Sequence, residues 1–396
     1  MKDIDQEALK LHKKFQGKLA TIPLVQVKNK HDLSLVYTPG VAEPSRQIAK
    51  NKSLAYDLTW RGRTVAVISN GSAVLGLGNI GAEAALPVME GKALLLKTLG
   101  GIDAVPVVIN TQDADEIIKF VKLIAPTFSG ILLEDIAAPI CFQVEDALQN
   151  IGIPVFHDDQ HGTAIVCTAA LKNAAKVVGK KYEDLHVVIV GAGAAGLATA
   201  KMLLGYSCTI DSCRKIQGQK SVDDLIVVDK IGAITIGRNN QNIYKQQIAG
   251  FSNKKNQQGE LAKIIKDADA VIGLSGPDLI TKAMVRSMNK NAIIIAMANP
   301  IPEIMPEEAL AAGAAIVATG RSDFPNQVNN SLAFPGIFRA VVRGRLTKIT
   351  QEMKNAASDA LATYIKNPTL TNIVPDMFAP DLSEHIANKL LAIRKA

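Results

Sequence analysis

Two pairs of adjacent acids stand where buried strands are expected to end. Glu134 and Asp135 follow the apolar run "GILL", and Asp158 and Asp159 follow "IPVFH". In open parallel sheets the carboxyl ends of the strands form the ligand crevice, so the two pairs can converge there. Carboxylate oxygens without a cysteine among them suit a hard divalent ion such as Mg²⁺ or Mn²⁺. The sequence therefore predicts a metal site built from these acids.

A single acid pair at a strand end is usually a solvated turn, and that is the alternative interpretation of each pair. Two pairs at two strand ends favour a functional site over two unrelated turns. His157 and His161 flank the second pair. We expect them to begin the following helix or to support the ligands, and not to bind the metal themselves.

Two glycine-rich stretches match the dinucleotide-binding pattern G-x-G-x-x-G: "GLGNIG" at 76–81 and "GAGAAG" at 191–196. A cofactor loop needs a strand that stops at the first glycine and a helix that begins directly after it, because the helix N-terminus then faces the pyrophosphate. "HVVIVGAGAAGLATAKMLL" meets both demands, so the second stretch is the predicted cofactor loop. "NGSAVL" separates the first stretch from its strand. That stretch is either a close backbone approach or a glycine turn without a ligand.

The strand after the predicted cofactor loop, "LIVVDK", ends in Asp229, the acid expected beside the adenosine ribose. Its separation from Gly196 exceeds the usual ~20 residues. The excess lies in residues 206–222, which read as an inserted surface loop. We place this insertion where the adenosine end of the cofactor is read.

From Thr64 onward, short β-branched runs alternate with helical patterns, which predicts an α/β fold with parallel sheets. Nine runs read as strands: 64–69, 103–109, 130–135, 153–159, 185–191, 225–230, 269–275, 292–300 and 314–320. Asp113 is a predicted N-cap for the helical pattern after the second run. We expect an N-terminal substrate and metal domain over 1–160. A Rossmann-type, doubly wound NAD(P) domain with C-terminal helices that pack back is expected over 161–396.

The bulk composition is that of a globular enzyme. The chain has 396 residues, of which 48% are hydrophobic and 20% are charged, with a formal net charge of +7. The basic residues are scattered and aromatics are few, which argues against nucleic-acid binding. No apolar run reaches the ~20 residues of a membrane span, and residues 1–15 read as an amphipathic helix and not as a signal peptide. The four cysteines lack zinc spacing, so we expect reduced thiols in a cytoplasmic protein.

The chain resembles the malic enzyme family, in its shorter, bacterial-type form. The resemblance rests on successive blocks in matching order, from about Ser34 to Ala340: "SLVYTPGVAEP", "VISNGSAVLGLGNIG", "PVMEGKALLLK", "GIDAVP", "LLEDIAAP", "VFHDDQHGTA", "VIVGAGAAG", "MANP" and "NNSLAFPGIFRA". The resemblance implies oxidative decarboxylation of L-malate to pyruvate and CO₂. It also implies reduction of NAD or NADP, a divalent metal (Mg²⁺ or Mn²⁺), and a homodimer.

The resemblance also assigns roles, block by block. Tyr37 falls on the catalytic tyrosine, Lys92 on the catalytic lysine, and Asp158 on the acid that assists the lysine. As metal ligands it implies Glu134, Asp135 and Asp159. As amides that hold the substrate carboxylates it implies Asn299 and Asn329 or Asn330. The expected cofactor-binding residues are Gly191, Gly193, Ala194, Ala195, Gly196, Asp229 and Asn299.

These roles are chemically consistent. A metal that chelates the C2 hydroxyl and the carboxylate of malate makes the hydroxyl more acidic. Lys92 then acts as general base while hydride leaves C2, and Tyr37 as general acid protonates the enolate at C3 after CO₂ departs. Lysine is ordinarily protonated at neutral pH, so a relay through Asp158 is one hypothesis for the onward path of the proton. Taken singly, Tyr37 and Lys92 would be an ordinary turn tyrosine and a surface lysine.

Two departures from the family pattern leave alternatives open. Ala73 stands where larger members carry a malate-binding arginine, so the substrate carboxylates need another cation: Arg46, Lys97 or a residue of a second subunit. Asp229 favours NAD over NADP, because it would repel a 2′-phosphate. Lys230 and Arg238 lie close enough in sequence to support NADP instead.

Two other classes of function compete with this interpretation. One is a metal-assisted 2-hydroxy-acid dehydrogenase that does not decarboxylate, which needs no proton donor at C3. The other is a catalytically inactive dinucleotide sensor, which needs neither acid pair, nor Tyr37, nor Lys92.

Overall fold

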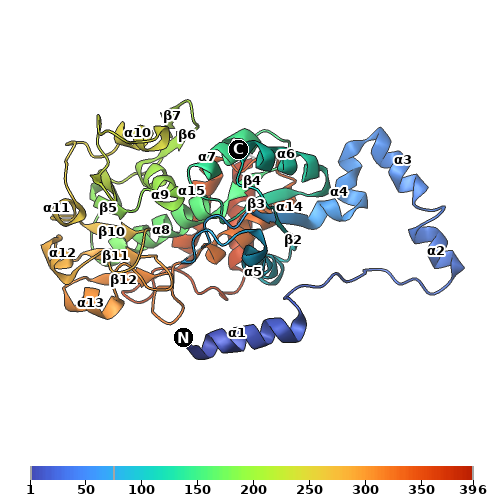
Figure 1. Ribbon diagram of the computed structural model, residues 1–396, viewed down its shortest axis with the longest axis horizontal. Coiled ribbons are helices and arrows are strands. Elements are labelled where there is room, and N and C mark those ends of the chain that lie inside the picture. The colour runs from blue at the N-terminus through green and yellow to red at the C-terminus, as the bar shows by residue number, and fades with distance from the viewer. Residues whose placement is uncertain (1, 75, 395–396) are drawn as a thin grey trace.

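Two parallel sheets form the framework of this computed structural model, which describes residues 2–74 and 76–394 (Figure 1). The first sheet has the strand order β2-β1-β3-β4 and the second the order β12-β11-β10-β5-β8-β9. The first sheet consists of β1 (Thr64–Ser69), β2 (Asp103–Val108), β3 (Gly130–Leu133) and β4 (Val155–His157). The second consists of β5 (His186–Val190), β8 (Asp224–Asp229), β9 (Gly232–Ala233), β10 (Ala270–Gly273), β11 (Ile293–Ala296) and β12 (Ile316–Thr319). All nine predicted strands are confirmed, and only the short edge strand β9 runs antiparallel within these sheets.

Alternation along the strands of the second sheet divides the core between its two faces. In β5, Val187 and Ile189 belong to one cluster of buried residues and Val188 and Val190 to another. The second cluster packs under α11 (Leu261–Ile264), α12 (Lys282–Ser287) and α13 (Pro306–Ala311). A parallel strand covered on both faces reads as a continuous apolar run, which is why "HVVIV" lacks a polar face. The doubly wound domain is confirmed.

One helix joins the two sheets. α8 (Asp158–Val177) begins directly after β4, and fifteen of its twenty residues are buried. A helix that is apolar on all sides belongs in the interior. Accordingly, the first core cluster runs without a break from the first sheet, through α8, to one face of the second sheet. The two sheets are therefore connected by a buried helix and not by a flexible linker.

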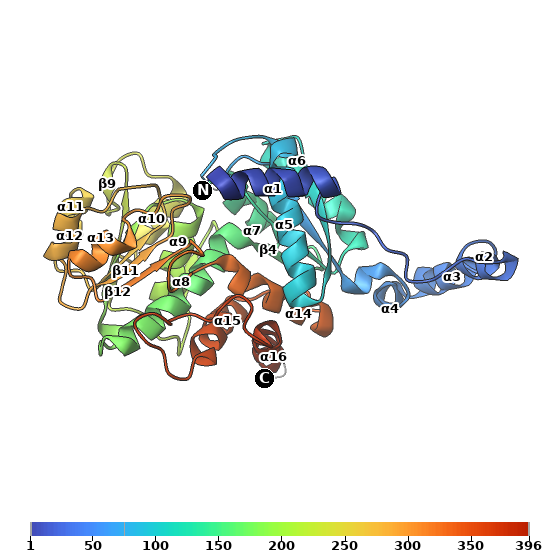
Figure 2. The same cartoon turned by 90° about the horizontal axis from the view of Figure 1, so that it is seen from below.

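Other helices surround the first sheet. α5 (Ala82–Gly100), α6 (Ala114–Ile124) and α7 (Ile140–Leu148) come from the same region of the chain, and Asp113 caps α6 as predicted by accepting from the Glu116 amide at 2.9 Å. The C-terminal helices are α14 (Phe334–Gly344), α15 (Gln351–Tyr364) and α16 (Leu382–Arg394). They return to the first sheet, where α14 contacts α5 and β3 (Figure 2). Within the described residues, no helix is long and apolar enough to cross a membrane.

The insertion at 206–222 lies at the opposite end of the sheet from the place that we expected. α9 (Ala194–Leu204) begins at the carboxyl end of β5 and runs back, and β8 is parallel to β5. The link from α9 to β8 therefore falls at the amino ends of the strands, away from the cofactor loop. The expectation that it reads the adenosine is wrong.

The insertion also changes the interpretation of the cysteines. It forms a hairpin of β6 (Tyr206–Cys208) and β7 (Cys213–Lys215), which packs near α10 (Ile243–Ala249). A disulfide joins Cys208 to Cys213, whereas Cys141 and Cys167 are free and buried. The prediction of four reduced thiols is therefore wrong for Cys208 and Cys213. The cysteines no longer support the expectation of a reducing compartment.

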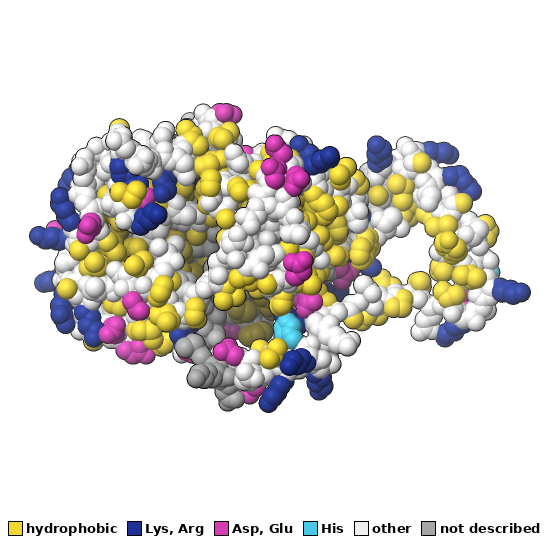
Figure 3. Space-filling view, in the orientation of Figure 1, with side chains coloured by type: hydrophobic (Ala, Val, Ile, Leu, Met, Phe, Trp, Pro, Cys, Tyr) yellow, Lys and Arg dark blue, Asp and Glu magenta, His cyan; other side chains and the backbone are white. Residues whose placement is uncertain are grey.

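Part of the N-terminal segment projects away from the body. It contains α1 (Lys2–Phe15), α2 (Lys30–Val36), α3 (Ala42–Lys50) and α4 (Ala55–Leu58), and α2 and α3 project to one side (Figures 1 and 2). We call residues 19–50 the arm. No residue of α2 or α3 is buried, although the arm carries many large apolar side chains (Figure 3). The exposed ones are Leu19, Ile22, Leu24, Val25, Val27, Leu33, Leu35, Val36, Tyr37 and Val41.

Candidate active site

The two acid pairs meet because β3 and β4 are neighbours. Leu132 pairs with Phe156 and Leu133 with His157, so both strands end at the same edge of the sheet. Glu134 and Asp135 follow one strand, and Asp158 and Asp159 begin α8 after the other. One carboxylate oxygen from each of Glu134, Asp135 and Asp159 lies within 4.8 Å of the others. The predicted convergence of these three acids is confirmed.

Lys92 enters this carboxylate cluster from α5. Its Nζ lies 2.5 Å from Asp158 Oδ2 and 2.9 Å from Glu134 Oε1. Asp158 is fully buried, and its other oxygen packs against Gly162, where any side chain would come within 1.9 Å of it. Asp158 can therefore adopt this side-chain conformation only because the residue one turn later, Gly162, has no side chain.

The electrostatics of the cluster call for a cation. Burial, opposed by Lys92 but reinforced by the neighbouring acids, raises the pKa of Glu134 well above its usual range. Burial and the Asp159 charge raise the pKa of Asp135 to about 7. Although burial disfavours its charge, Asp158, Glu134 and Asp159 raise the pKa of Lys92 above its usual range. Among the described residues, one ammonium therefore faces four carboxyl groups, so negative charge is in excess at this site.

The backbone at Asp135 is strained in a way that serves the cluster. Its φ is +54°, in the left-handed region that costs a non-glycine residue free energy. This turn points its amide at Asp159 Oδ2, which accepts the hydrogen bond at 2.7 Å. Asp135 Oδ2 is buried and has no hydrogen-bond partner among the described residues. An unpaired, buried carboxylate oxygen is a fitting ligand for a divalent ion.

Neither histidine near the second pair points to the metal site as a ligand. His157 is fully buried and its Nδ1 lies 3.7 Å from Asp159 Oδ2, too far for a hydrogen bond. The His161 Nε2 lies 2.7 Å from Glu145 Oε1, on another side of α8. The prediction of supporting positions at the start of the helix agrees with this geometry.

The second glycine loop has the geometry that the sequence predicted. β5 ends at Val190, Gly191 follows with φ +119°, and α9 begins at Ala194 after Gly193 as N-cap. A Cβ at Gly196 would lie 1.8 Å from the Gly191 carbonyl oxygen, so the helix can approach the strand only through a glycine. The free amides at the start of α9 therefore face the end of the sheet, where a pyrophosphate would bind.

The first glycine loop packs against the second domain at the cleft. A Cβ at Gly76 would lie 2.5 Å from the carbonyl oxygen of Asn299, so this close approach requires glycine. Gly76 and Asn299 both line a cavity of about 590 Å³ between the two domains. Of the two alternatives for "GLGNIG", the close backbone approach is confirmed.

The same cavity brings together residues from both halves of the chain. Asn329 and Asn330 line it beside Lys92 and Asp159. Asn330 accepts from Thr163 Oγ1 at 3.1 Å and donates to the Asp158 carbonyl at 3.4 Å. Ala195 of the cofactor loop lines its other wall. The cavity therefore connects the carboxylate cluster to the dinucleotide loop.

Three residues assigned or considered from sequence do not lie there. Tyr37 follows α2 on the arm with 67% of its surface exposed, and Arg46 is on α3, paired with Glu43. Lys97 pairs with Asp103 at 2.6 Å on the surface. Of the described residues that line the cavity, Lys92 is the only cation. Within the described part of one chain, neither Tyr37 nor a second cation thus lies at the expected site.

Asp229 lies at the carboxyl end of β8 as predicted, with cations bound to it. Arg238 donates to both of its oxygens, at 3.0 and 2.6 Å, and Lys245 Nζ lies 2.7 Å from Oδ2. Although burial disfavours its charge, these hydrogen bonds hold the pKa of Asp229 below its usual range. The carboxylate therefore stays charged at any working pH.

Glu303 is a buried acid that the sequence did not lead us to predict. Glu303 is fully buried and accepts from the amides of Ser275 at 2.9 Å and Ala298 at 3.0 Å. Both amides belong to loops that line the cavity. The signal in the sequence was Gly273, which ends an apolar strand: a Cβ there would lie 2.3 Å from Glu303 Cδ. Glu303 thus holds the β10 and β11 loops together.

A dinucleotide loop that faces an acid-lined cleft across a domain boundary is the arrangement of a nicotinamide-dependent oxidoreductase. Residues 16–149 match the malic enzyme N-terminal domain and residues 160–394 the malic enzyme NAD-binding domain. The chain belongs to the malic enzyme family, whose reaction is the oxidative decarboxylation of malate with NAD or NADP.

Individual relatives agree with this assignment. The chain is 51% identical over 390 residues to the bifunctional malic/malolactic enzyme of Bacillus subtilis, covering 96% of this chain and 92% of that protein. It is 48% identical over 373 residues to the NAD-dependent malic enzyme of Geobacillus stearothermophilus, covering 93% and 75%. The crystal structure of the Thermotoga maritima NAD-dependent malic enzyme superposes with a TM-score of 0.90 at 42% identity, covering 97% and 98%. The predicted family and fold class are confirmed.

The role of Glu303 can be tested by Glu303→Gln. The amide places an N–H opposite one of the two backbone N–H groups, so one loop loses its acceptor, at a cost of about 1–3 kcal/mol. We expect the KM for the coenzyme to rise about tenfold while kcat changes less, since a displaced loop weakens binding. Glu307→Gln, an exposed acid on α13, is the matched control. An unchanged KM in Glu303→Gln would contradict the role.

Proposed function

We propose that the cavity between the two sheets oxidises L-malate and decarboxylates it to pyruvate and CO₂, with Lys92, Asp158 and a divalent metal at its centre. The observation that carries the proposal is the position of Lys92 Nζ, 2.5 Å from Asp158 and 2.9 Å from Glu134, in direct continuity with the three-acid cluster. A metal-assisted dehydrogenase that does not decarboxylate would use the same acids and base but would need no proton donor at C3.

Glu134, Asp135 and Asp159 would hold Mg²⁺ or Mn²⁺. The unpaired Asp135 oxygen, the raised pKa of Asp135 and the excess of carboxyl groups over cations all favour a bound cation here. When bound, the metal polarises the C2 hydroxyl of malate and offsets the carboxylate charge that keeps Lys92 protonated. Lys92 would first pass a proton to buried Asp158, to which its Nζ is hydrogen-bonded, and would then accept the hydroxyl proton as hydride leaves C2.

The amides are placed to orient the substrate. Asn299 and Asn330 line the cavity together with Lys92, and Asn330 is hydrogen-bonded to Thr163 and to the Asp158 carbonyl. We assign Asn299, Asn329 and Asn330 to the substrate carboxylates, with Asn299 also close to the nicotinamide. The amides at 191–196 would bind the pyrophosphate.

Tyr37 and the missing cation point to a homodimer. The arm that carries Tyr37 exposes a run of apolar side chains which a single chain does not cover. Burying such a surface against a second copy would stabilise the arm by about 25 cal/mol per Å². We propose that the arm of each copy docks on the other copy, so that Tyr37 protonates the enolate in the neighbouring cavity and Arg46 of the same arm pairs with a substrate carboxylate.

Complementation between two inactive variants tests this shared site. Tyr37→Phe and Lys92→Gln should each lose at least about a hundredfold in kcat, the usual scale of a general acid or base. In a mixed dimer, one cavity combines intact Lys92 with intact Tyr37 of the other chain. Random mixing makes half of the dimers mixed, so about a quarter of wild-type activity should return.

Each variant alone, unfolded and refolded in the same way, is the control for the mixture. If the mixture stays as inactive as its components although mixed dimers form, Tyr37 does not act across the dimer. If the protein is monomeric at assay concentrations and fully active, the homodimer proposal also fails.

We propose that NAD is preferred over NADP. Relatives are named for either coenzyme, so the preference depends on this chain's own residues. Asp229 stays charged and lies where the adenosine ribose ends, and a 2′-phosphate there would meet its carboxylate. Arg238 and Lys245 are already engaged by that carboxylate, which limits their attraction for the phosphate.

Parallel titrations with NAD and NADP, at fixed malate and Mn²⁺, test the preference. We expect a higher kcat/KM with NAD, and Asp229→Ser should shift the ratio toward NADP by about tenfold, equal to about 1.4 kcal/mol. Asp223→Ser, which removes an exposed carboxylate before the same strand, is the control. A wild-type preference for NADP would overturn the proposal.

A further inference from the structure

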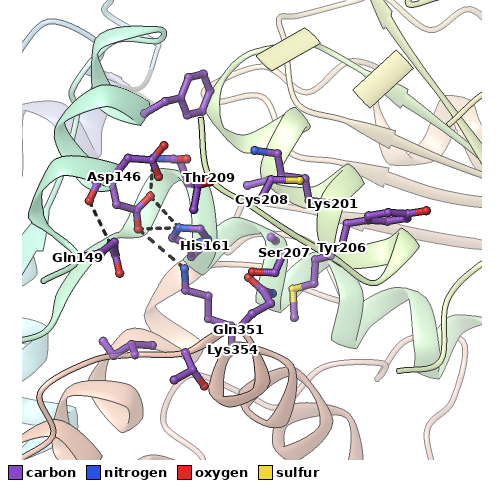
Figure 4. A pocket seen from close by; sticks show the side chains of 18 of the residues that line it. Asp146, Gln149, His161, Lys201, Tyr206, Ser207, Cys208, Thr209, Gln351 and Lys354 are labelled. Carbon is purple, nitrogen blue, oxygen red and sulfur yellow. Dashed lines mark hydrogen bonds and ion pairs between the residues drawn. The ribbon is translucent and has the colours of Figure 1, made fainter. Parts of the chain in front are cut away.

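A second cavity, of about 370 Å³, lies apart from the catalytic cleft (Figure 4). Its walls come from α7 of the first domain, the beginning of α8, α9, the disulfide-closed hairpin and α15. The hairpin is the insertion whose purpose the catalytic site does not explain. It contributes Ser207, Cys208 and Thr209 to this wall.

Two lysines reach this cavity without a hydrogen-bond partner among the residues that the structure describes. Lys354 on α15 is 8% exposed, and Lys201 extends from α9 on another wall, as Figure 4 shows. Among the described residues, Lys201 forms no ion pair, and Lys354 comes no closer than 3.9 Å to Glu145 Oε1. Burial lowers the pKa of both lysines, although the nearby charges of Glu145 and Asp146 act to raise it.

The acids of the cavity do not neutralise these lysines. Glu145 is occupied by the Gln160 Nε2 at 3.0 Å and by the His161 Nε2 at 2.7 Å. Burial and the Glu145 charge raise the pKa of Asp146 to about 6, and Asp146 forms no ion pair with Lys201 within the described ranges. Arg214 and Glu352 face each other at 3.9 Å on the rim. Lys201 and Lys354 therefore remain available.

Uncharged donors and an aromatic wall complete the cavity. Gln149, Gln351 and Ser207 line it, and so does Tyr244, which is 4% exposed and whose hydroxyl has no hydrogen-bond partner in the described part of the chain. Lys201 Nζ lies 5.9 Å from the centre of the Tyr244 ring. Buried charges in proteins are normally paired, and buried polar groups are normally hydrogen-bonded. Among the described residues, Lys201 has no ion pair, Lys354 has only a long one of 3.9 Å to Glu145, and the Tyr244 hydroxyl has no hydrogen bond.

We propose that this cavity is a binding site for a small organic anion with two anionic groups, one held by Lys201 and the other by Lys354. The shared chemistry is an anionic oxygen group, carboxylate or phosphate. The site goes beyond the proposed catalytic function and does not depend on it. The first turn of α8 separates this site from the catalytic acids. Gln160 and His161 of that turn line this cavity, whereas Asp158 and Asp159 belong to the carboxylate cluster.

A bound anion would bridge three parts of the chain. Lys201 belongs to the second domain, Lys354 to the C-terminal helices, and the acids next to them to α7 of the first domain. Binding should therefore raise the melting temperature, because a ligand that binds only the folded state stabilises it. Because Gln160 and His161 line this cavity, a bound anion would also contact the first turn of α8, which carries Asp158 and Asp159.

The test uses the full-length protein with succinate or inorganic phosphate as the probe. Crystals soaked in either probe should show density between Lys201 and Lys354, and the melting temperature should rise with probe concentration. Lys201→Met and Lys354→Met remove the ammonium but keep the stem, and each should weaken binding at least tenfold. Lys176→Met, an exposed lysine on α8, should bind as the wild type does.

The two probes distinguish the sources of the anion. Binding of succinate alone supports a dicarboxylate, and binding of phosphate alone supports a phosphorylated compound. The proposal is overturned if neither probe shows density in the cavity, or if both methionine variants bind the probe as the wild type does. Because succinate can also enter the catalytic cleft, the density in the cavity and not the temperature shift alone decides.

Discussion

The ion pairs of Lys92 with Asp158 and Glu134 are the interactions on which the rest of the site depends. They place an ammonium where four carboxyl groups converge, and they are possible only because β3 and β4 are adjacent and α8 begins immediately after β4. Lys92 is paired with two acids, whereas the buried carboxyl groups outnumber it, and a buried charge without a partner is costly. The cluster is therefore poised to take up a divalent cation, and its protonation responds to that cation.

Helix α8 connects this chemistry with the remainder of the molecule. Its buried length packs against both sheets, its first residues supply Asp158 and Asp159, and another side of its first turn faces the second cavity through Gln160 and His161. Because interiors are close-packed, a displacement of this helix would be felt at both places. The arm has the opposite character, since its apolar side chains have no cover within one chain. The hydrophobic core forms within one copy of the chain. In our proposal, by contrast, the catalytic residues of each site come from two copies.

Much of this could be predicted from the sequence, because strand periodicity and strand-end acids are local signals. Parallel strands bring their carboxyl ends to one edge, so Glu134, Asp135 and Asp159 could be placed together before any coordinates. The signals failed where tertiary packing decides: nothing local indicates that Tyr37 lies on an exposed arm, or that Glu303 joins two loops. The position of the insertion depends on α9, which runs back along β5, and the spacing of Asp229 from the glycine loop does not encode this direction. The Cys208–Cys213 bond depends on the β6–β7 hairpin that brings the two thiols together, which neither the missing zinc spacing nor the missing signal peptide reveals.

The most direct test of the account is the position of a metal ion. Crystals grown with Mn²⁺ and examined by anomalous diffraction should show one ion bound by Glu134, Asp135 and Asp159, at oxygen distances of about 2.0–2.3 Å, a range spanning the hard divalent ions. Lys92 Nζ should remain beside Asp158 in the same crystals. An ion found elsewhere, or none at these three carboxylates at saturating Mn²⁺, would contradict the central claim.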